Sequence, residues 1–454
     1  MKRFVYTILF ACFLVGCGGE TEEVTKGTSS KKISFFTISD AYKEMIHRRS
    51  SYKTIYAKAE ATEESKKLAI QNNRFALNFY AQLKQEKAEQ GKNLFFSPFS
   101  LYTVLGMLYL GANDGGKQEL AEVLGLQGLG DVGKEFYNLQ GIILKKIVFD
   151  AEIALCNAAW ISDSAKVLPA YENILREFFK AEIFKGKLNS PEVVKQINAW
   201  VEKQTQGRIS NIIDENNLPN KRSRLILINT LYFKGFWSDS YKFERFMTGE
   251  KDFTLVTDKK VKVPMMHNSG QDYKYVETDQ MQMIAIPYKG YSAHLYIVLP
   301  LKTTNLNAIE TAFTPENLMC WITNMKPVKA ERLMISKLKI GINFTANEML
   351  KKLGVKAVFD TIRPVYLKGI DGGVDSLFVK QILQKTYFEV YEEGAEAVVV
   401  TEKEERKFEE KKSEIKEPPK KFTFEANRPF LFFIADREFK AILFIGRVMN
   451  LAEK

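Results

Sequence analysis

The chain has 454 residues, of which 45% are hydrophobic and 12% aromatic, which is enough for a large buried core. The formal net charge is +11, but no zinc finger, basic helix or basic run with interleaved aromatic residues appears, so nucleic-acid binding is not expected. Only His47, His267 and His294 are present, and none stands at metal-ligand spacing from another ligand type. We therefore expect no metal, no other cofactor and no catalytic triad.

Residues 1–16 have the organisation of an export signal. Lys2 and Arg3 give a positive start, and an apolar run follows that is too short to be a good membrane span. Leu14-Val15-Gly16-Cys17 is a small-residue cleavage site that ends in cysteine, and it resembles a bacterial lipoprotein signal. The resemblance implies cleavage before Cys17, lipidation of Cys17 and a chain anchored to the cell envelope, periplasmic or surface-exposed. An ordinary secretory leader is the alternative.

Residues 17–64 are rich in Gly, Ser, Thr, Lys and Glu, which predicts a flexible tether that lets a folded body stand off the membrane. An apolar helical repeat begins at Ser65, and no internal repeat follows, so we expect one folded domain over residues 65–454. If Cys12 leaves with the leader, Cys156 and Cys320 are the remaining candidates for a disulfide. The sequence leaves their pairing open.

The run from Glu389 to Thr401 combines a strand signal with a nearby solvated segment. It ends in Ala397-Val398-Val399-Val400-Thr401, and such β-branched residues favour extended pairing. The next twenty residues, Glu402 to Lys421, include fifteen charged ones and must be solvated. Gly394 precedes the small-residue run and is a natural pivot, because glycine tolerates dihedrals that other residues avoid. The run is either an edge strand before a linker or a strand that a sheet can accept.

Several motifs, in order along the chain, resemble one known family. Asn93-Leu94-Phe95-Phe96-Ser97-Pro98-Phe99-Ser100, followed by Gly111-Ala112, is similar to the opening signature of the serpins, and Glu389 to Thr401 is similar to their reactive-loop hinge. Further similar segments are Ile197–Ile209, Leu227–Trp237, Val263–Met266, Ile286–Tyr288, Leu350–Phe359, Phe424–Ile434 and Leu443–Val448. The resemblance covers about residues 65 to 452. It implies an α+β serpin fold with three β-sheets, about eight or nine helices and an exposed reactive loop at about residues 392–419, in a monomer.

The resemblance also implies roles for particular residues. Serpins hold the hinge with an acid paired to a lysine under a tryptophan, and the matching gate residues are Glu392, Lys337 and Trp237. The implied hinge residues are Glu392, Glu393, Gly394, Ala395, Glu396, Ala397, Val399 and Thr401. The residues implied at the opening of the main sheet are Ser97, Ser100, Asn229 and Gln384. Gln384 stands where the family often has histidine, and its amide can still donate and accept hydrogen bonds.

The position of the cut bond follows from a count along the loop. In related inhibitors the acid matching Glu392 is the seventeenth residue before that bond, which places the cut between Phe408 and Glu409. The loop is longer than usual, so Arg406 and Lys407 are alternatives for the residue that fills the protease's primary pocket. A basic residue there implies a trypsin-like target, and Phe408 implies a chymotrypsin-like or cysteine protease.

The function implied by the resemblance is inhibition, not catalysis. A target protease would cut the loop, form an acyl-enzyme and be trapped as the hinge inserts as a new central strand. The inward positions would be Ala395, Ala397, Val399 and Thr401, which are small or β-branched and uncharged, whereas Lys403 and Glu405 would bury charges. The alternative is a non-inhibitory serpin, a binding or structural surface lipoprotein. An unrelated enzyme or receptor is a third class, but no catalytic constellation is visible.

Overall fold

The computed structural model describes residues 51–86, 89–214, 224–362, 364–374, 377–379, 382–394 and 421–451. The α-helices are α2 (Glu63–Leu83), α3 (Pro98–Gly111), α4 (Asp114–Leu124), α5 (Val132–Ile147), α6 (Pro169–Phe178), α7 (Pro191–Gln204), α8 (Leu306–Ala312), α9 (Pro315–Asn324), α10 (Asn347–Leu353) and α11 (Lys368–Asp371). Among the described residues, no helix combines the length and apolar character needed to cross a bilayer.

Fifteen strands complete the described fold. They are β1 (Leu94–Phe96), β2 (Ala151–Ser162), β3 (Glu182–Gly186), β4 (Leu225–Gly235), β5 (Gly249–Thr254), β6 (Lys260–Asn268), β7 (Asp272–Glu277), β8 (Met281–Pro287), β9 (Ala293–Pro300), β10 (Lys326–Ser336), β11 (Leu338–Thr345), β12 (Leu383–Val390), β13 (Lys421–Glu425), β14 (Phe430–Asp436) and β15 (Ile442–Val448). Helices and strands are mixed along the chain, as the α+β prediction requires.

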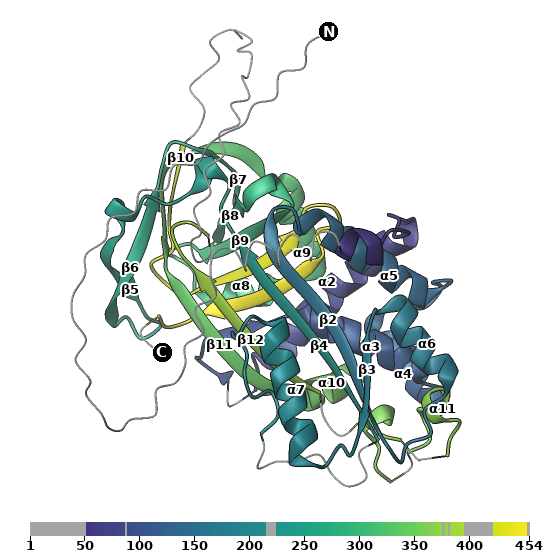
Figure 1. The fold of residues 1–454 in the computed structure, drawn as a ribbon. Coiled ribbons are helices and arrows are strands. Elements are labelled where there is room, and N and C mark those ends of the chain that lie inside the picture. Colours follow the sequence, from purple (N-terminus) through teal and green to yellow (C-terminus); the bar gives the residue numbers. More distant parts are fainter. Residues whose placement is uncertain are drawn as a thin grey trace, which may run out of the picture.

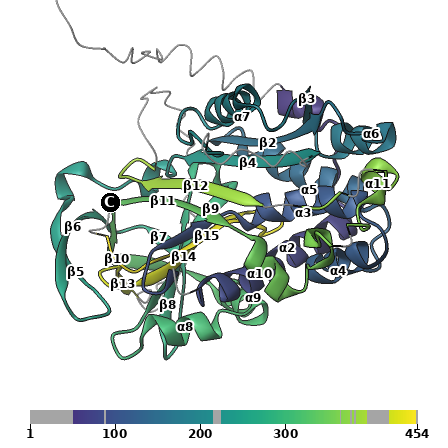
Figure 2. The same ribbon diagram turned by 90° about the horizontal axis from the view of Figure 1, so that it is seen from below.

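The strands form three hydrogen-bonded sheets, which confirms the predicted fold class. The largest has ten strands in the order β1-β15-β14-β9-β8-β7-β10-β6-β5, with β13 paired to β10. Strands β9, β14 and β15 are buried along their whole length, so this sheet carries the centre of the core. The smaller sheets are β11-β12 and β3-β2-β4, and they lie side by side (Figure 1). Figure 2 shows α7 on one side of these strands and α3 and α5 on the other.

Several helices begin at a hydroxyl residue followed by proline. Ser97, Ser190 and Thr314 each accept a hydrogen bond from a backbone N–H in the first turn of α3, α7 and α9. Each is followed by a proline, which suits the first helical position because its missing N–H would have no partner there. The local sequence therefore fixes where α3 starts, and this start matters for the site described below.

The folded body begins earlier than residue 65, the boundary predicted from composition. Helix α2 starts at Glu63, and the residues before it pack onto α5: Tyr52, Tyr56 and Ala59 are all buried. The rings of Tyr56 and Tyr137 have centroids 5.2 Å apart. The composition of this segment is mostly polar and so gave no sign that it docks. A few well-spaced apolar side chains are enough to fix a short segment.

The two cysteines that remained candidates for a disulfide are not joined to each other. Cys156 is half-buried in β2, and Cys320 is exposed on α9. The fold therefore depends on packing and hydrogen bonds in the residues described.

The docked segment gives a test of the corrected boundary. Tyr56 is 1% exposed and its neighbour Ile55 is 39% exposed. We expect Tyr56→Ala to lower the free energy of unfolding by about 3 kcal/mol, because a buried ring is replaced by a cavity. Ile55→Ala is the matched control and should change it by less than about 0.5 kcal/mol. Urea unfolding of both variants measures this, and equal effects would show that the segment does not dock in solution.

Candidate functional site

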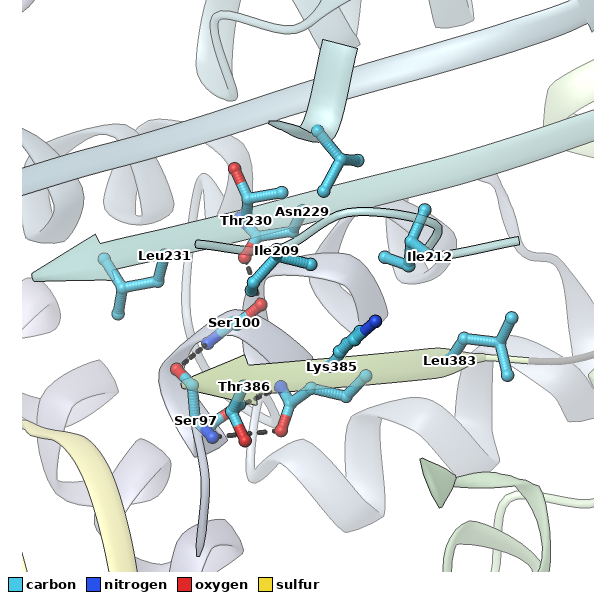
Figure 3. Close-up of a pocket in the computed structure, with 12 residues that line it drawn as sticks. Ser97, Ser100, Ile209, Ile212, Asn229, Thr230, Leu231, Leu383, Lys385 and Thr386 are labelled. Carbon is cyan, nitrogen blue, oxygen red and sulfur yellow. Dashed lines mark hydrogen bonds between the residues drawn. The ribbon is translucent and has the colours of Figure 1, made fainter. Parts of the chain in front are cut away.

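The two small sheets face each other across a gap between β4 and β12. Figure 3 shows both arrowheads at the same end, so the two strands run in the same direction. In the described residues β4 pairs only with β2 and β12 only with β11, and a pocket lies between them. Its lining includes Asn229, Thr230 and Leu231 from β4 and residues 383–386 from β12. Each strand therefore presents to the gap a backbone edge that no strand of the described residues covers.

Gln384 ties β12 to the start of α3. Its Oε1 accepts a hydrogen bond from Ser97 N at 2.9 Å, and its Nε2 donates to Ser97 O at 2.8 Å. Both residues are buried, and Ser97 Oγ donates to Leu443 O at 2.8 Å. The side-chain amide of Gln384 therefore both donates and accepts a hydrogen bond, as predicted for this position, where the family often has histidine.

Ser100 ties β4 to the same helix start. Its hydroxyl donates to Asn229 Oδ1, and Asn229 Nδ2 donates to Asn157 Oδ1 of β2 at 2.6 Å. Ser100 N in turn donates to Ser97 Oγ at 3.1 Å, the hydrogen bond that caps the helix. The four residues predicted at the sheet opening therefore lie together, and the two sides of the gap are bound to one helix turn (Figure 3).

A tight turn follows β12 and reverses the chain. Tyr391 N donates to Gly394 O at 3.3 Å, and Gly394 N donates to Tyr391 O at 3.2 Å. Gly394 has φ +109°, a conformation that glycine adopts without strain. The predicted pivot is therefore the last residue of a tight reversing turn that directly follows β12.

Trp237 joins this turn to the chain that follows β4. Its backbone N donates to Glu393 O at 3.0 Å, and its Nε1 donates to Tyr391 O at 2.8 Å. Its fully buried ring stacks on Tyr288 with centroids 4.8 Å apart. Trp237 therefore links the end of β4 to the turn after β12 and closes the gap at this end.

Glu392 is the acid of the gate, and its side chain is only 7% exposed. Lys337 Nζ lies 2.8 Å from its Oε1, and Thr248 Oγ1 donates to the same oxygen at 2.9 Å. Burial raises the pKa of Glu392, but hydrogen bonds from Lys337, the backbone and Thr248 together outweigh it, so the pKa lies below its ordinary value of 4.5. Glu392 and Lys337 are therefore paired, and Trp237 donates hydrogen bonds to Tyr391 and Glu393 on either side of Glu392.

Several residues of this site were missed from the sequence. Thr248 on Glu392 and Asn157 on Asn229 are single polar residues without a motif. The segment that follows α7 also covers the outer side of the gap: Lys385 Nζ donates to Ser210 O at 2.7 Å, and Tyr232 OH donates to Gln206 Oε1 at 3.3 Å. The segment Ile197–Ile209 resembles a serpin motif, but nothing in its sequence indicates contacts to both β4 and β12.

Other predicted residues lie outside the described part of the chain. They are the lipidation residue Cys17, the hinge residues Ala395, Glu396, Ala397, Val399 and Thr401, and the reactive-bond candidates Arg406, Lys407, Phe408 and Glu409. Their predicted roles remain predictions.

Comparison with known proteins gives a consistent result. The family model described as serpin (serine protease inhibitor) matches residues 70–451. The chain belongs to the serpin family. It is 30% identical to an uncharacterised serpin-like protein of Methanosarcina acetivorans, over 84% of this chain and 87% of the relative.

Two further similar proteins bear on this serpin's function. The leukocyte elastase inhibitor of Xenopus tropicalis is 28% identical over 82% of this chain and 96% of its own. The crystal structure of Serpin48 from the insect Tenebrio molitor superimposes with a TM-score of 0.71 and 28% identity, covering 86% of this chain and 100% of that one. Serpins are generally protease inhibitors rather than catalytic enzymes.

The gate predicts a pH dependence with a defined sign. Because the pKa of Glu392 is lowered, its ionised form stabilises the native hinge above pH 4.5, and this stabilisation is lost as the pH falls through the lowered value. At pH 7 we expect Glu392→Gln to lower the free energy of unfolding by about 1 kcal/mol. The difference from the wild type should vanish in acid.

Glu393→Gln is the matched control, since Glu393 is more exposed and pairs with Arg245 at 2.6 Å on the surface. Thermal unfolding from pH 7 down to pH 3 measures both variants. If Glu392→Gln lowered the free energy of unfolding as much at pH 3 as at pH 7, the stabilising role of the ionised Glu392 would be contradicted.

Gly394 allows a steric test of the turn. A Cβ there would lie 2.6 Å from Trp237 N and closer still to Gly235 O and Phe236 Cα. We expect Gly394→Ala to lower the free energy of unfolding by more than about 2 kcal/mol, from strain and clash together. Gly270→Ala is the control, because Gly270 also has positive φ, +80°, but nothing lies within 4 Å of its added Cβ. Thermal melts of the two variants that coincide would show that the turn does not pack on Trp237.

Proposed function

We propose that this serpin is a suicide-substrate inhibitor of serine proteases, with cysteine proteases as a second target class. The observation that carries the proposal is the uncovered pair of strand edges of β4 and β12, with a reversing turn at residues 391–394 beside them. A strand that ran back from Gly394 between β4 and β12 would be antiparallel to both. It would pair with both edges at once.

The proposed reaction uses the protease's own chemistry. Its serine oxygen would attack the carbonyl carbon of Phe408, and the bond to the nitrogen of Glu409 would break, leaving an ester between Phe408 and the protease. The freed hinge would then enter the gap and carry the acyl-enzyme to the far end of the sheet. The protease's catalytic groups would be displaced before water could hydrolyse the ester.

The energetics favour insertion of the first part of the loop. A new central strand gains on the order of 1 kcal/mol per hydrogen bond, and about a dozen bonds are available. Ala395, Ala397, Val399 and Thr401 are small or β-branched and would fit the inward positions. Lys403 and Glu405 would follow them inward, and each buried charge opposes insertion by several kcal/mol. These two residues are the specific reason to retain the alternative of a non-inhibitory serpin that binds partners at the cell surface.

The central experiment is a search for an SDS-stable complex with a panel of serine and cysteine proteases. We expect a covalent band with at least one protease, cleavage within residues 406–409, and a cleaved form that melts at a much higher temperature than the intact one. Ala397→Arg should abolish the band and turn the protein into a substrate, because it places a charge at an inward position. Glu396→Arg, at the neighbouring outward position, should leave the band. A cleaved form that melts like the intact one would favour the non-inhibitory function.

We also propose that the mature chain starts at a lipidated Cys17, which would anchor the inhibitor to the cell envelope. The support is the sequence Leu14-Val15-Gly16-Cys17 after a positive, apolar leader. Mass spectrometry of the membrane fraction should find a diacylglyceryl group on the Cys17 sulfur and an acylated amino group. Cys17→Ser should release the protein from membranes. An unmodified N-terminus at any other residue would contradict the anchor.

A further inference from the structure

Cations and exposed apolar side chains meet on one face, at the junction of three turns. The turns are the end of α5 (146–150), residues 289–292 between β8 and β9, and residues 437–440 between β14 and β15. We call this the lysine–aromatic face. Its members are Lys53, Lys66, Lys146, Phe149, Lys274, Lys289, Tyr291, Arg437 and Lys440. None of these residues takes part in the site between β4 and β12.

Direct contacts show that the three turns form one continuous surface. Lys53 Nζ lies 4.8 Å from the centroid of the Phe149 ring. Lys146 Nζ is paired with the carboxylate of Glu438. Arg437 N donates to Ser292 O at 2.8 Å. The end of α5 is therefore bound both to the segment that enters the domain and to the turn between β14 and β15.

The cations of this face lie close to one another. A hydrogen bond from Lys146 lowers the pKa of Glu438, and the charges of Lys440 and Lys66 lower it further, so three lysines surround one exposed carboxylate. On the other side, burial lowers the pKa of Lys440, and the like charges of Lys274 and Arg437 add to this although Asp436 opposes it. Bound anions would relieve this repulsion.

The neighbouring carboxylate, Asp436, is already committed to the backbone. It is buried and accepts hydrogen bonds from Phe439 N at 2.9 Å and Ala441 N at 2.7 Å. Glu63 lies beside Lys66 at 2.6 Å, and its side chain is 79% exposed. Asp150 lies against Gly290, and Asp239 lies near Lys289. The seven cations of the face therefore outnumber the five carboxylates Glu63, Asp150, Asp239, Asp436 and Glu438.

Two aromatic residues stand exposed among these cations. Phe149 is 42% exposed and Tyr291 is 41% exposed. Exposed lysines around aromatic side chains suit the boundary of a bilayer, where rings lie at the headgroup level and ammonium groups meet lipid phosphates. A soluble polyanion would use the cations but not the apolar side chains.

We propose that the lysine–aromatic face binds the surface of an anionic phospholipid bilayer. The described chain begins at Ser51, two residues before Lys53, so the segment that leads back to Cys17 leaves the domain beside this face. The proposed anchor would make the contact intramolecular, so that a weak intrinsic affinity suffices to hold the domain against the membrane. The inference rests on the anchor only for this tethering, because the affinity of the face itself can be measured without lipid on the protein.

The test uses the mature chain with Cys17→Ser and sedimentation with lipid vesicles. Vesicles of phosphatidylcholine alone are compared with vesicles that contain about 30% phosphatidylglycerol. We expect binding to the anionic vesicles only, with loss of binding as salt rises from about 0.1 M to about 0.5 M. Lys53→Gln with Lys289→Gln should weaken binding by roughly fivefold for each lysine removed. Phe149→Ser should weaken it further without changing the net charge.

Lys195→Gln with Lys302→Gln is the matched control. This variant also removes two positive charges, one on α7 and one just after the C-terminal end of β9, whereas Tyr291 lies just before the start of β9. It should leave vesicle binding unchanged. Equal losses in the two double variants would reduce the effect to net charge and overturn the proposal. It would also be overturned if dextran sulfate bound as tightly as vesicles and Phe149→Ser had no effect, since the face would then be a general polyanion site. Protease inhibition by the same variants should be unchanged, so a failure here is distinguishable from a failure of the proposed function.

Discussion

Two adjacent strands that run in the same direction without bonding to each other impose the main constraint on this protein. Backbone groups at the edges of β4 and β12 gain their full hydrogen bonding only if a third strand lies between them. In the native arrangement, the facing edges of β4 and β12 therefore remain available for pairing with a further strand. A small number of side-chain and backbone hydrogen bonds around the gap keeps this arrangement, because in the described part of the chain β4 and β12 are not paired with each other.

The two ends achieve this by different chemistry. At one end, neutral groups of Ser97, Ser100 and Gln384 bond within a buried helix start, so the closure is insensitive to salt and pH. At the other end, the charge of Glu392 joins a lysine and a threonine hydroxyl. The neutral hydrogen bonds and the charged pair respond differently to salt and pH. A change in conditions that weakens the contacts at one end therefore does not by itself weaken those at the other.

The sequence predicted the fold and much of the site, for identifiable reasons. Ser97-Pro98 and Glu392-Glu393-Gly394 are local signals, because capping, proline and glycine act within a few residues. The partners Lys337 and Trp237 came from family resemblance, since they are far from Glu392 in the chain. Thr248 and Asn157 carry no local signal, and their roles depend on three-dimensional contacts that a single sequence does not encode visibly. The docking of Tyr56 was missed because its segment is polar on average.

That docking has a consequence for how a soluble form could arise. Tyr56 and Ala59 pack against α5, where a side chain on Gly141 would collide with both. For the anchored chain proposed above, cleavage by an envelope protease upstream of Ser51 would release the domain with Tyr56 and Ala59 still packed on α5. Cleavage after Tyr56 would remove the buried rings of Tyr52 and Tyr56 and expose the side chains of α5 that they cover. The position of the shedding cut would therefore decide between a stable secreted protein and one prone to aggregate.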